Sequence, residues 1–306
     1  MTMISNSTSA FYERASLGIG DLRRRAEELQ AQLGSGEKLS RSSDNPVVAS
    51  RLRVLSRSDQ LSGINQANAD RASADLTLAD DALSSFGDYV TRAKELALQA
   101  SNGTLTNAQR AGIGTELAQI HGNLVALANS RDSAGHSLFG GEIAGQPYSL
   151  DASGNAVYAG TASAGEISLG EGQTVSRGLT GPEFLNFSVA GSPTDLMAVV
   201  KGLADALQGG SADPAASARD ALGALDAGFD AITTGQTLIG ARLSWIDLTT
   251  AHRENLGELR SEEETTIGAT DIASTMAQLQ QTMLVLEASQ ASFARLSSLS
   301  LFSVLQ

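Results

Sequence analysis

Residues 272–286 read IASTMAQLQQTMLVL and place apolar side chains at alternating steps of four and three. Such spacing makes a narrow apolar seam along a helix, which is typical of a helix that packs against another helix. The seam comprises Ile272, Met276, Leu279, Met283 and Leu286, and Phe293 continues it after a polar Gln290. Because chain ends are normally the least ordered parts of a domain, a seam at this position predicts a terminal helix that is used for contact.

The N-terminal region carries a matching seam. Its apolar positions are Leu22, Ala26, Leu29 and Leu33. The helical pattern runs from about Ala10 to Leu33 and stops at residues 34–36 (GSG), since glycine adopts the left-handed geometry that ends helices. Residues 2–9 are small and polar and are expected to be frayed in the isolated chain. The two chain ends are therefore predicted to form a helical pair.

Long helices are predicted between these ends. Residues 43–45 offer capping side chains, and Pro46 stands where its missing N–H costs nothing, so a helix starts there and continues to residues 101–103 (SNG). A further helix is expected to start at Thr106 or Asn107. Apolar residues at helical spacing return over 196–207 and, after Pro214, over 222–246.

The central region has a different composition. Gly and Ser cluster between residues 140 and 193, and short alternating runs occur at 148–150, 156–158, 166–169 and 174–175. Residues 151–155 (DASGN) separate two of these runs and are typical of a hairpin turn. The region is therefore predicted to be a small β-rich insertion.

These patterns predict a mainly α fold: an elongated helical bundle with terminal coiled-coil helices and a small central β-rich insertion. The nested order of the segments places both termini at one end and the insertion at the other. Three parts are expected: a terminal coiled-coil assembly domain (1–45 with 262–306), a long-helix domain (46–140 with 194–261) and a small β-rich outer domain (141–193).

Composition restricts the classes of partner. The formal charge of −13 disfavours nucleic acid and anionic membrane surfaces, because both repel an acidic protein. No apolar run approaches the ~18 residues of a membrane span, so no membrane insertion is expected. Cysteine is absent, which excludes disulfides and thiolate metal sites. The first ten residues lack the apolar core of a secretory signal peptide.

The sequence also lacks complete motifs for metal binding or catalysis. His121, His136 and His252 lack metal-ligand spacing and are expected to be polar residues on or near helix surfaces. Residues 135–139 (GHSLF) match a nucleophile elbow only in part, and residues 262–264 (EEE) are expected to form an exposed helical face. The sequence therefore predicts no catalytic, cofactor-binding or metal-binding residue, no cofactor and no enzyme.

Several motifs resemble those of the bacterial flagellin superfamily. They are residues 33–39 (LGSGEKL), 42–49 (SSDNPVVA), 137–141 (SLFGG), 239–243 (IGARL), 286–290 (LEASQ) and 299–305 (LSLFSVL). Pro46 together with the Leu301-Phe302 ending is similar to the hook–filament junction branch, the hook-associated protein 3 type, more than to flagellins proper. Glu37 stands where the family more often has a basic residue, and Asn45 where an aspartate is common.

This resemblance implies a structural, extracellular subunit of the bacterial flagellum, exported unfolded through the flagellar secretion channel without a cleaved signal. The partners it implies are copies of itself in a ring, a neighbouring junction protein on the hook side, flagellin on the filament side and an export chaperone. Contacts between subunits are then expected at the seams, on Leu22, Ala26, Leu29, Leu33, Met276, Leu279, Met283, Leu286 and Phe293.

Two other functions stay open on the sequence. The first is a minor or atypical filament flagellin of the same superfamily. The second is a surface adhesin whose β-rich insertion binds glycans, although the rings that could stack on sugars are few: Tyr148, Tyr158, Phe184 and Phe187.

Overall fold

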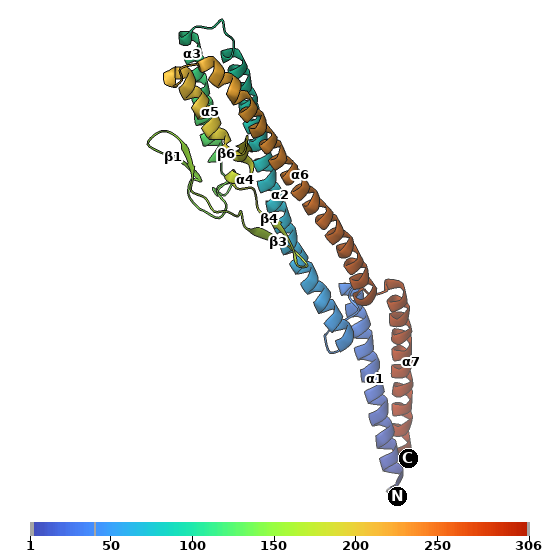
Figure 1. Cartoon of the computed structure of the whole chain (residues 1–306). Coiled ribbons are helices and arrows are strands. Elements are labelled where there is room, and N and C mark those ends of the chain that lie inside the picture. The colour runs from blue at the N-terminus through green and yellow to red at the C-terminus, as the bar shows by residue number, and fades with distance from the viewer. Residues whose placement is uncertain (1–2, 40, 305–306) are drawn as a thin grey trace. The chain divides into compact units, whose positions relative to one another are not determined.

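The computed structural model describes residues 3–39 and 41–304, with side chains for 10–39 and 41–296. The chain forms two compact units, Met1–Gln60 with Asn255–Gln306, and Leu61–Glu254. Long helices dominate and strands are short, so the predicted mainly α fold is confirmed (Figure 1). The division into three parts stays a prediction. Leu305 of the C-terminal motif and residue 2 of the polar N-terminal stretch lie outside the described residues.

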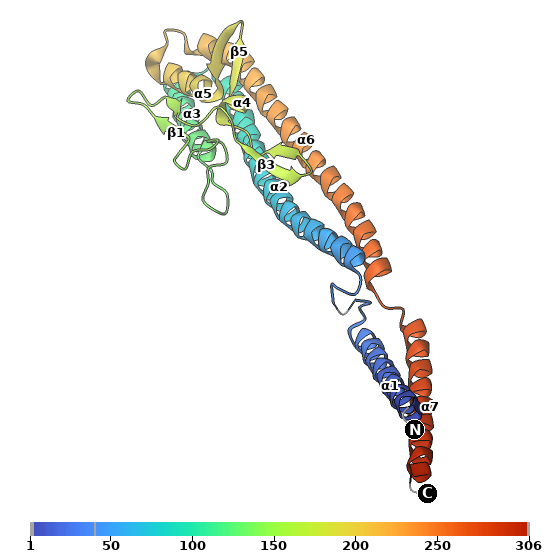
Figure 2. The same cartoon turned by 90° about the horizontal axis from the view of Figure 1, so that it is seen from below.

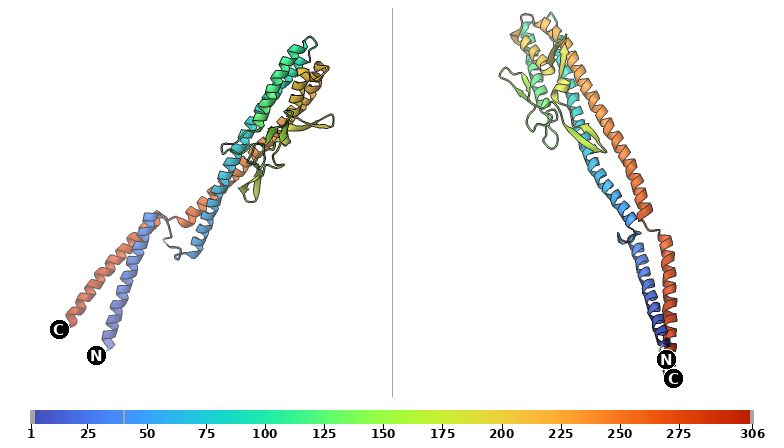
Figure 3. Two further views of the ribbon diagram at one scale, coloured as in Figure 1. Left: turned by 90° about the vertical axis from the view of Figure 1, so that its left-hand side faces the viewer. Right: turned by 60° about the horizontal axis from the view of Figure 1, so that its bottom comes forward.

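The first unit contains the two terminal helices, α1 (Met3–Ser35) and α7 (Ile272–Val304), which pack side by side. Both views of Figure 3 show them running in opposite directions. Helix α1 begins at Met3, so the expected start at Ala10 is wrong. The expected fraying of residues 2–9 in the isolated chain stays a prediction. Extending an existing helix costs far less than nucleating one, so weak helix formers can continue a helix that already exists.

Local signals start and end the helices as predicted. Helix α2 (Pro46–Ala100) begins at Pro46, and Asn45 Oδ1 accepts a hydrogen bond from Val48 N at 3.2 Å. Helix α3 (Asn107–Ala128) begins with a reciprocal cap between Thr106 and Gln109. At the end of α1, Gly36 has a φ of 73°, the left-handed geometry that the GSG stretch predicted.

The second unit has a helical core. Helix α3 packs against α5 (Leu196–Asp205) and against the π-helical turn η1 (Ala206–Gly210) that follows it. The unit also contains most of α2 and of α6 (Pro214–Gly268). One continuous core joins these helices, and rings of Phe86, Phe139 and Phe184 meet at its centre with centroids 4.9–6.2 Å apart.

The β-rich insertion packs on this core (Figure 2). In the described part of the chain it forms three separate antiparallel hairpins with one short helix, α4 (Gly181–Leu185), between the second and the third. The strands are β1 (Tyr148–Leu150), β2 (Ala156–Tyr158), β3 (Glu166–Gly170), β4 (Gln173–Ser176), β5 (Asn186–Val189) and β6 (Ser192–Asp195). The first two hairpins match the predicted runs, whereas β5–β6 was not predicted.

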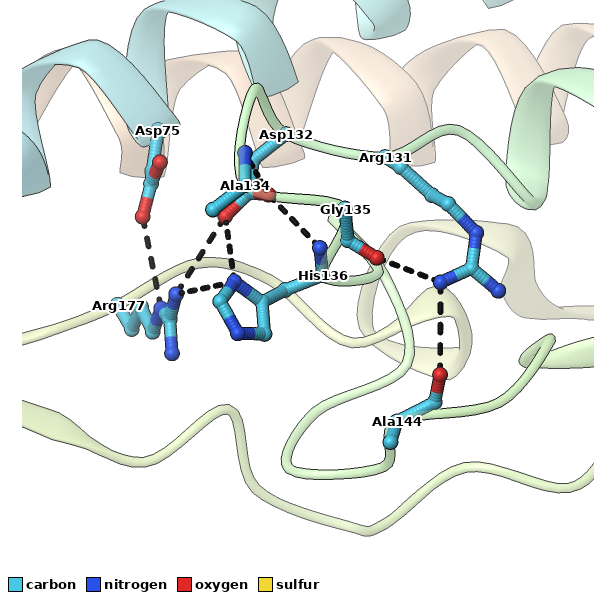
Figure 4. A network of polar contacts seen from close by, with 8 residues as sticks. All are labelled: Asp75, Arg131, Asp132, Ala134, Gly135, His136, Ala144 and Arg177. Carbon is cyan, nitrogen blue, oxygen red and sulfur yellow. Dashed lines mark hydrogen bonds and ion pairs between the residues drawn. The ribbon is translucent and has the colours of Figure 1, made fainter.

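A polar network ties the insertion to the helices (Figure 4). Arg177, just after β4, pairs with Asp75 of α2 and with Asp132 of the loop after α3, at 3.4 Å in each case. Asp132 also accepts hydrogen bonds from the backbone N–H groups of Ala134 and His136 and contacts His136 Nδ1 at 3.1 Å. Burial opposes ionisation of Asp132, but these bonds lower its pKa.

The histidines differ in their surroundings. His252 and His136 are exposed, but His121 is only 7% exposed and its Nε2 has no hydrogen-bond partner among the described residues. The expectation of a surface position is therefore wrong for His121, which is buried and lies near enough to Lys201 and Asp205 of α5 for their charges to affect its pKa. Within the described residues, no group of three His, Asp or Glu side chains could hold a metal ion. None of the helices formed by the described residues contains an apolar stretch that could span a bilayer.

Candidate assembly interface

The α1 seam faces α7 only in part. Leu29 is 4% exposed, and Leu22, Ala26 and Leu33 are half-buried. Two terminal helices that contact only each other cannot cover both of their apolar surfaces, since each helix presents one stripe to its neighbour and the rest to solvent.

Helix α7 carries two apolar stripes where the sequence indicated one. Leu279, Leu286 and Phe293 are half-buried, and the positions that alternate with them along the same stripe are Thr275, Thr282 and Ser289. Ile272, Met276 and Met283 are 62%, 53% and 56% exposed and lie on a second stripe. The predicted contact residues therefore divide into a stripe on the α1 side and a stripe left open.

Tyr12 joins α1 to α7 and is not among the contact residues predicted from the sequence. Its ring meets that of Phe293 edge to face with centroids 5.6 Å apart, and its hydroxyl donates to the backbone oxygen of Leu296 at 3.0 Å. A tyrosine near the start of the first helix could have indicated this contact, because its side chain combines a large apolar ring with a polar hydroxyl.

A groove opens beside Tyr12, between α1 and α7. It has a volume of about 710 Å³ and is mostly apolar. Phe11, which is 47% exposed, and Leu296, which is 44% exposed, line it together with Ile19 and Leu22. Exposed apolar surface of this kind is typical of a site that another protein covers.

The segments next to the terminal helices are joined by backbone. Glu37 and Ala269 form an isolated antiparallel bridge, in which Lys38 N donates to Gly268 O at 2.7 Å and Thr270 N donates to Gly36 O at 2.9 Å. The bridge holds the end of α1 beside the start of α7. The sequence carried no strand pattern that could have indicated it.

Two ion pairs link α2 and α6 in the same unit. Arg51 Nε and Nη2 donate to the two carboxylate oxygens of Glu263 at 2.5 and 2.6 Å. Arg260 donates to Asp59 at 2.7 Å. Glu263 belongs to the acidic run that was expected to be an exposed face, and the Arg51 hydrogen bonds lower its pKa.

Comparison with known proteins identifies the helical architecture. Residues 6–144 match the family model of the bacterial flagellin N-terminal helical region. Flagellar hook-associated protein 3 of Salmonella typhimurium is 31% identical over 135 residues, which are 44% of this chain and 43% of that protein. The chain thus matches less than half of the length of this curated relative.

Two further comparisons cover more of the chain. A flagellar filament 30.7 kDa core protein of Treponema maltophilum is 25% identical over 66% of this chain and 75% of its own length. The crystal structure of the flagellar junction protein FlgL from Legionella pneumophila superposes with a TM-score of 0.60 at 15% identity, over 71% of this chain and 99% of that one. The likeness to that structure concerns the fold. Residues 6–144 are thus similar to a flagellin N-terminal helical region, and the fold of the chain is that of the solved flagellar junction protein.

Proposed function

We propose that this chain is a structural subunit of the bacterial flagellum that joins the hook to the filament and assembles through its terminal helices. The observation that carries the proposal is the exposed stripe of α7, where Ile272, Met276 and Met283 are each more than half exposed. A helix that hides one apolar stripe and exposes another needs a second partner for the exposed one.

The terminal seams divide between two roles in this proposal. Leu29, Leu279, Leu286 and Phe293 hold α1 and α7 together within one copy. Met276 and Met283 meet neighbouring subunits, and the groove beside Tyr12 receives an apolar side chain of a neighbour. Further expected partners are a junction protein on the hook side, flagellin on the filament side and an export chaperone, and the expected location is outside the cell.

Assembly through narrow helical seams requires no catalytic group. The free energy comes from apolar surface that leaves water when copies meet, about 25 cal/mol for each Å² buried. A polymer can therefore form from subunits that are individually stable but incompletely covered, and each added subunit covers the exposed stripe of its neighbour.

A minor or atypical filament flagellin is the second candidate, and the Treponema filament protein, matched over 75% of its length, is the observation in its favour. Deletion of the gene separates the two functions. Loss of a junction subunit should leave hooks without filaments and release flagellin into the medium. Normal filaments in the deletion strain would exclude the junction function, and the wild-type gene on a plasmid is the control.

A further inference from the structure

A small cavity lies where the β-rich insertion meets the helices of the second unit. Its volume is about 20 Å³. A cavity of roughly 10–15 Å³ or more can hold one water molecule, provided that two to four polar groups meet it. Four polar side chains line this one: Asp75 of α2, Asp132 and Ser137 of the loop after α3, and Arg177 just after β4. The cavity therefore has the size and the lining of a site for one water.

The hydroxyl of Ser137 needs a partner in this cavity. Its Oγ is buried and makes no hydrogen bond with any described residue. Gly140 packs closely on this group, since a Cβ at Gly140 would come 2.7 Å from Oγ, so the cavity is its open side. Burial of a hydroxyl without a hydrogen bond is costly, and ordered water commonly supplies the bond in such places.

The contacts of Arg177 are too long to use its charge fully (Figure 4). Its Nε lies 3.4 Å from Asp75 Oδ2, and its Nη2 lies 3.4 Å from Asp132 Oδ2. Hydrogen bonds between charged groups are normally about 2.7–2.9 Å long. The side chains of Asp75 and Asp132 are only 12% and 5% exposed, so bulk water reaches them poorly. A water held in the cavity would supply part of the missing hydrogen bonding.

The two carboxylates differ in how many bonds they already accept. Asp132 accepts from the backbone N–H groups of Ala134 and His136 and also contacts the His136 ring. Among the hydrogen bonds of the described residues, the Asp75 carboxylate takes part only in the long one with Arg177. Because a carboxylate offers about four acceptor positions, Asp75 is the better acceptor for a water O–H.

We propose that this cavity binds one ordered water molecule, which accepts a hydrogen bond from Ser137 Oγ and donates one to the Asp75 carboxylate. Arg177 already supplies positive charge between the two carboxylates and would repel a cation, so the occupant is neutral. The water joins α2 to the loop after α3 at the point where Arg177 fastens the insertion. The site lies within the second unit and is independent of the proposed function.

A crystal structure of the full chain, at a resolution that shows ordered waters, tests the site directly. We expect one density peak within about 2.7–3.2 Å of Ser137 Oγ and of an Asp75 oxygen. Ser137→Ala should abolish this peak or reduce its occupancy at least twofold. Ser133→Ala, at an exposed serine of the same loop, is the control and should keep the peak. An empty cavity in the wild type, or a peak with contacts of about 2.4 Å that mark a metal ion, would contradict the proposal.

A double-mutant cycle tests the bridge in solution. The fluorescence of Trp245, the only tryptophan, follows urea unfolding of the second unit. Ser137→Ala and Asp75→Ala should each lower the folding equilibrium constant about fivefold, and the double variant should lose at least threefold less than the roughly 25-fold product. Ser137 and Asp75 share no direct hydrogen bond among the described residues, so the water is what couples them.

The matched control cycle combines Ser133→Ala with Asp75→Ala, and its effects should multiply. If the effects of Ser137→Ala and Asp75→Ala also multiply, no water bridges the two side chains and the proposal is wrong.

Discussion

The ring of Tyr12 packs edge to face on the ring of Phe293, with the planes at 88°, and the Tyr12 hydroxyl donates to the backbone oxygen of Leu296. Tyr12→Phe keeps the ring and loses the hydrogen bond, which costs about 1 kcal/mol. Tyr12→Ala also loses the ring contact, which contributes a further ~0.5–1.5 kcal/mol beyond the lost apolar area. Tryptic cleavage at Arg14 should therefore accelerate in the order wild type, Tyr12→Phe, Tyr12→Ala, with cleavage at Arg71 as the internal control. Equal rates at Arg14 would contradict a role for the Tyr12 contact.

The two stripes of α7 should respond differently to one substitution. Leu286→Asp places a charge against α1 and should open the α1–α7 pair of the isolated chain, seen as faster amide hydrogen exchange in both helices. Met283→Asp changes the exposed stripe and should leave exchange in the isolated chain unchanged. Both variants should be exported and fail to assemble. Normal assembly of Met283→Asp would show that the exposed stripe is not an interface.

Gly240 and Gly235 form a matched pair within α6. A Cβ at Gly240 meets nothing within 4 Å, so Gly240→Ala should stabilise the second unit by about 1 kcal/mol in urea unfolding. A Cβ at Gly235 would lie 3.0 Å from Cβ of Phe184, so Gly235→Ala should bring a steric cost that offsets or exceeds the same helical gain. Equal stabilisation by both substitutions would contradict the close packing of α4 on α6.

His121 should make folding stability depend on pH. Burial, with a contribution from Lys201, lowers its pKa below the ordinary 6.5. The unfolded chain then binds a proton more readily than the folded one, so stability is complete above about pH 6.5 and falls as pH decreases through the window below it. His121→Leu should flatten this part of the stability profile relative to wild type. A profile unaffected by His121→Leu would contradict neutral burial of this side chain.

Local chemistry explains which elements could be predicted. Pro46 and Thr106 act within their own first turn, so the starts of α2 and α3 followed from the sequence. The turn of the β5–β6 hairpin uses Ala190 and Gly191, with φ of 47° and 82°. Alanine rarely adopts that geometry and Pro193 is unusual in a strand, so these residues do not have the pattern that is typical of a hairpin.

Tertiary context explains the rest. The three-four spacing predicted that α7 contacts another helix, but it could not divide the residues between two stripes. Met276 and Leu279 are both apolar, and only the position of α1 makes one exposed and the other half-buried. The Glu37–Ala269 bridge and the Arg51–Glu263 pair each join residues more than two hundred positions apart, so no local sequence pattern could predict them.

The position of the protein in the flagellum tests the central claim most directly. Intact flagella from a strain that carries an epitope-tagged, functional copy would be labelled with gold-conjugated antibody and viewed by electron microscopy, with the untagged strain as control. The account predicts gold confined to the boundary between hook and filament. Gold distributed along the filament would contradict it and identify the chain as a filament flagellin.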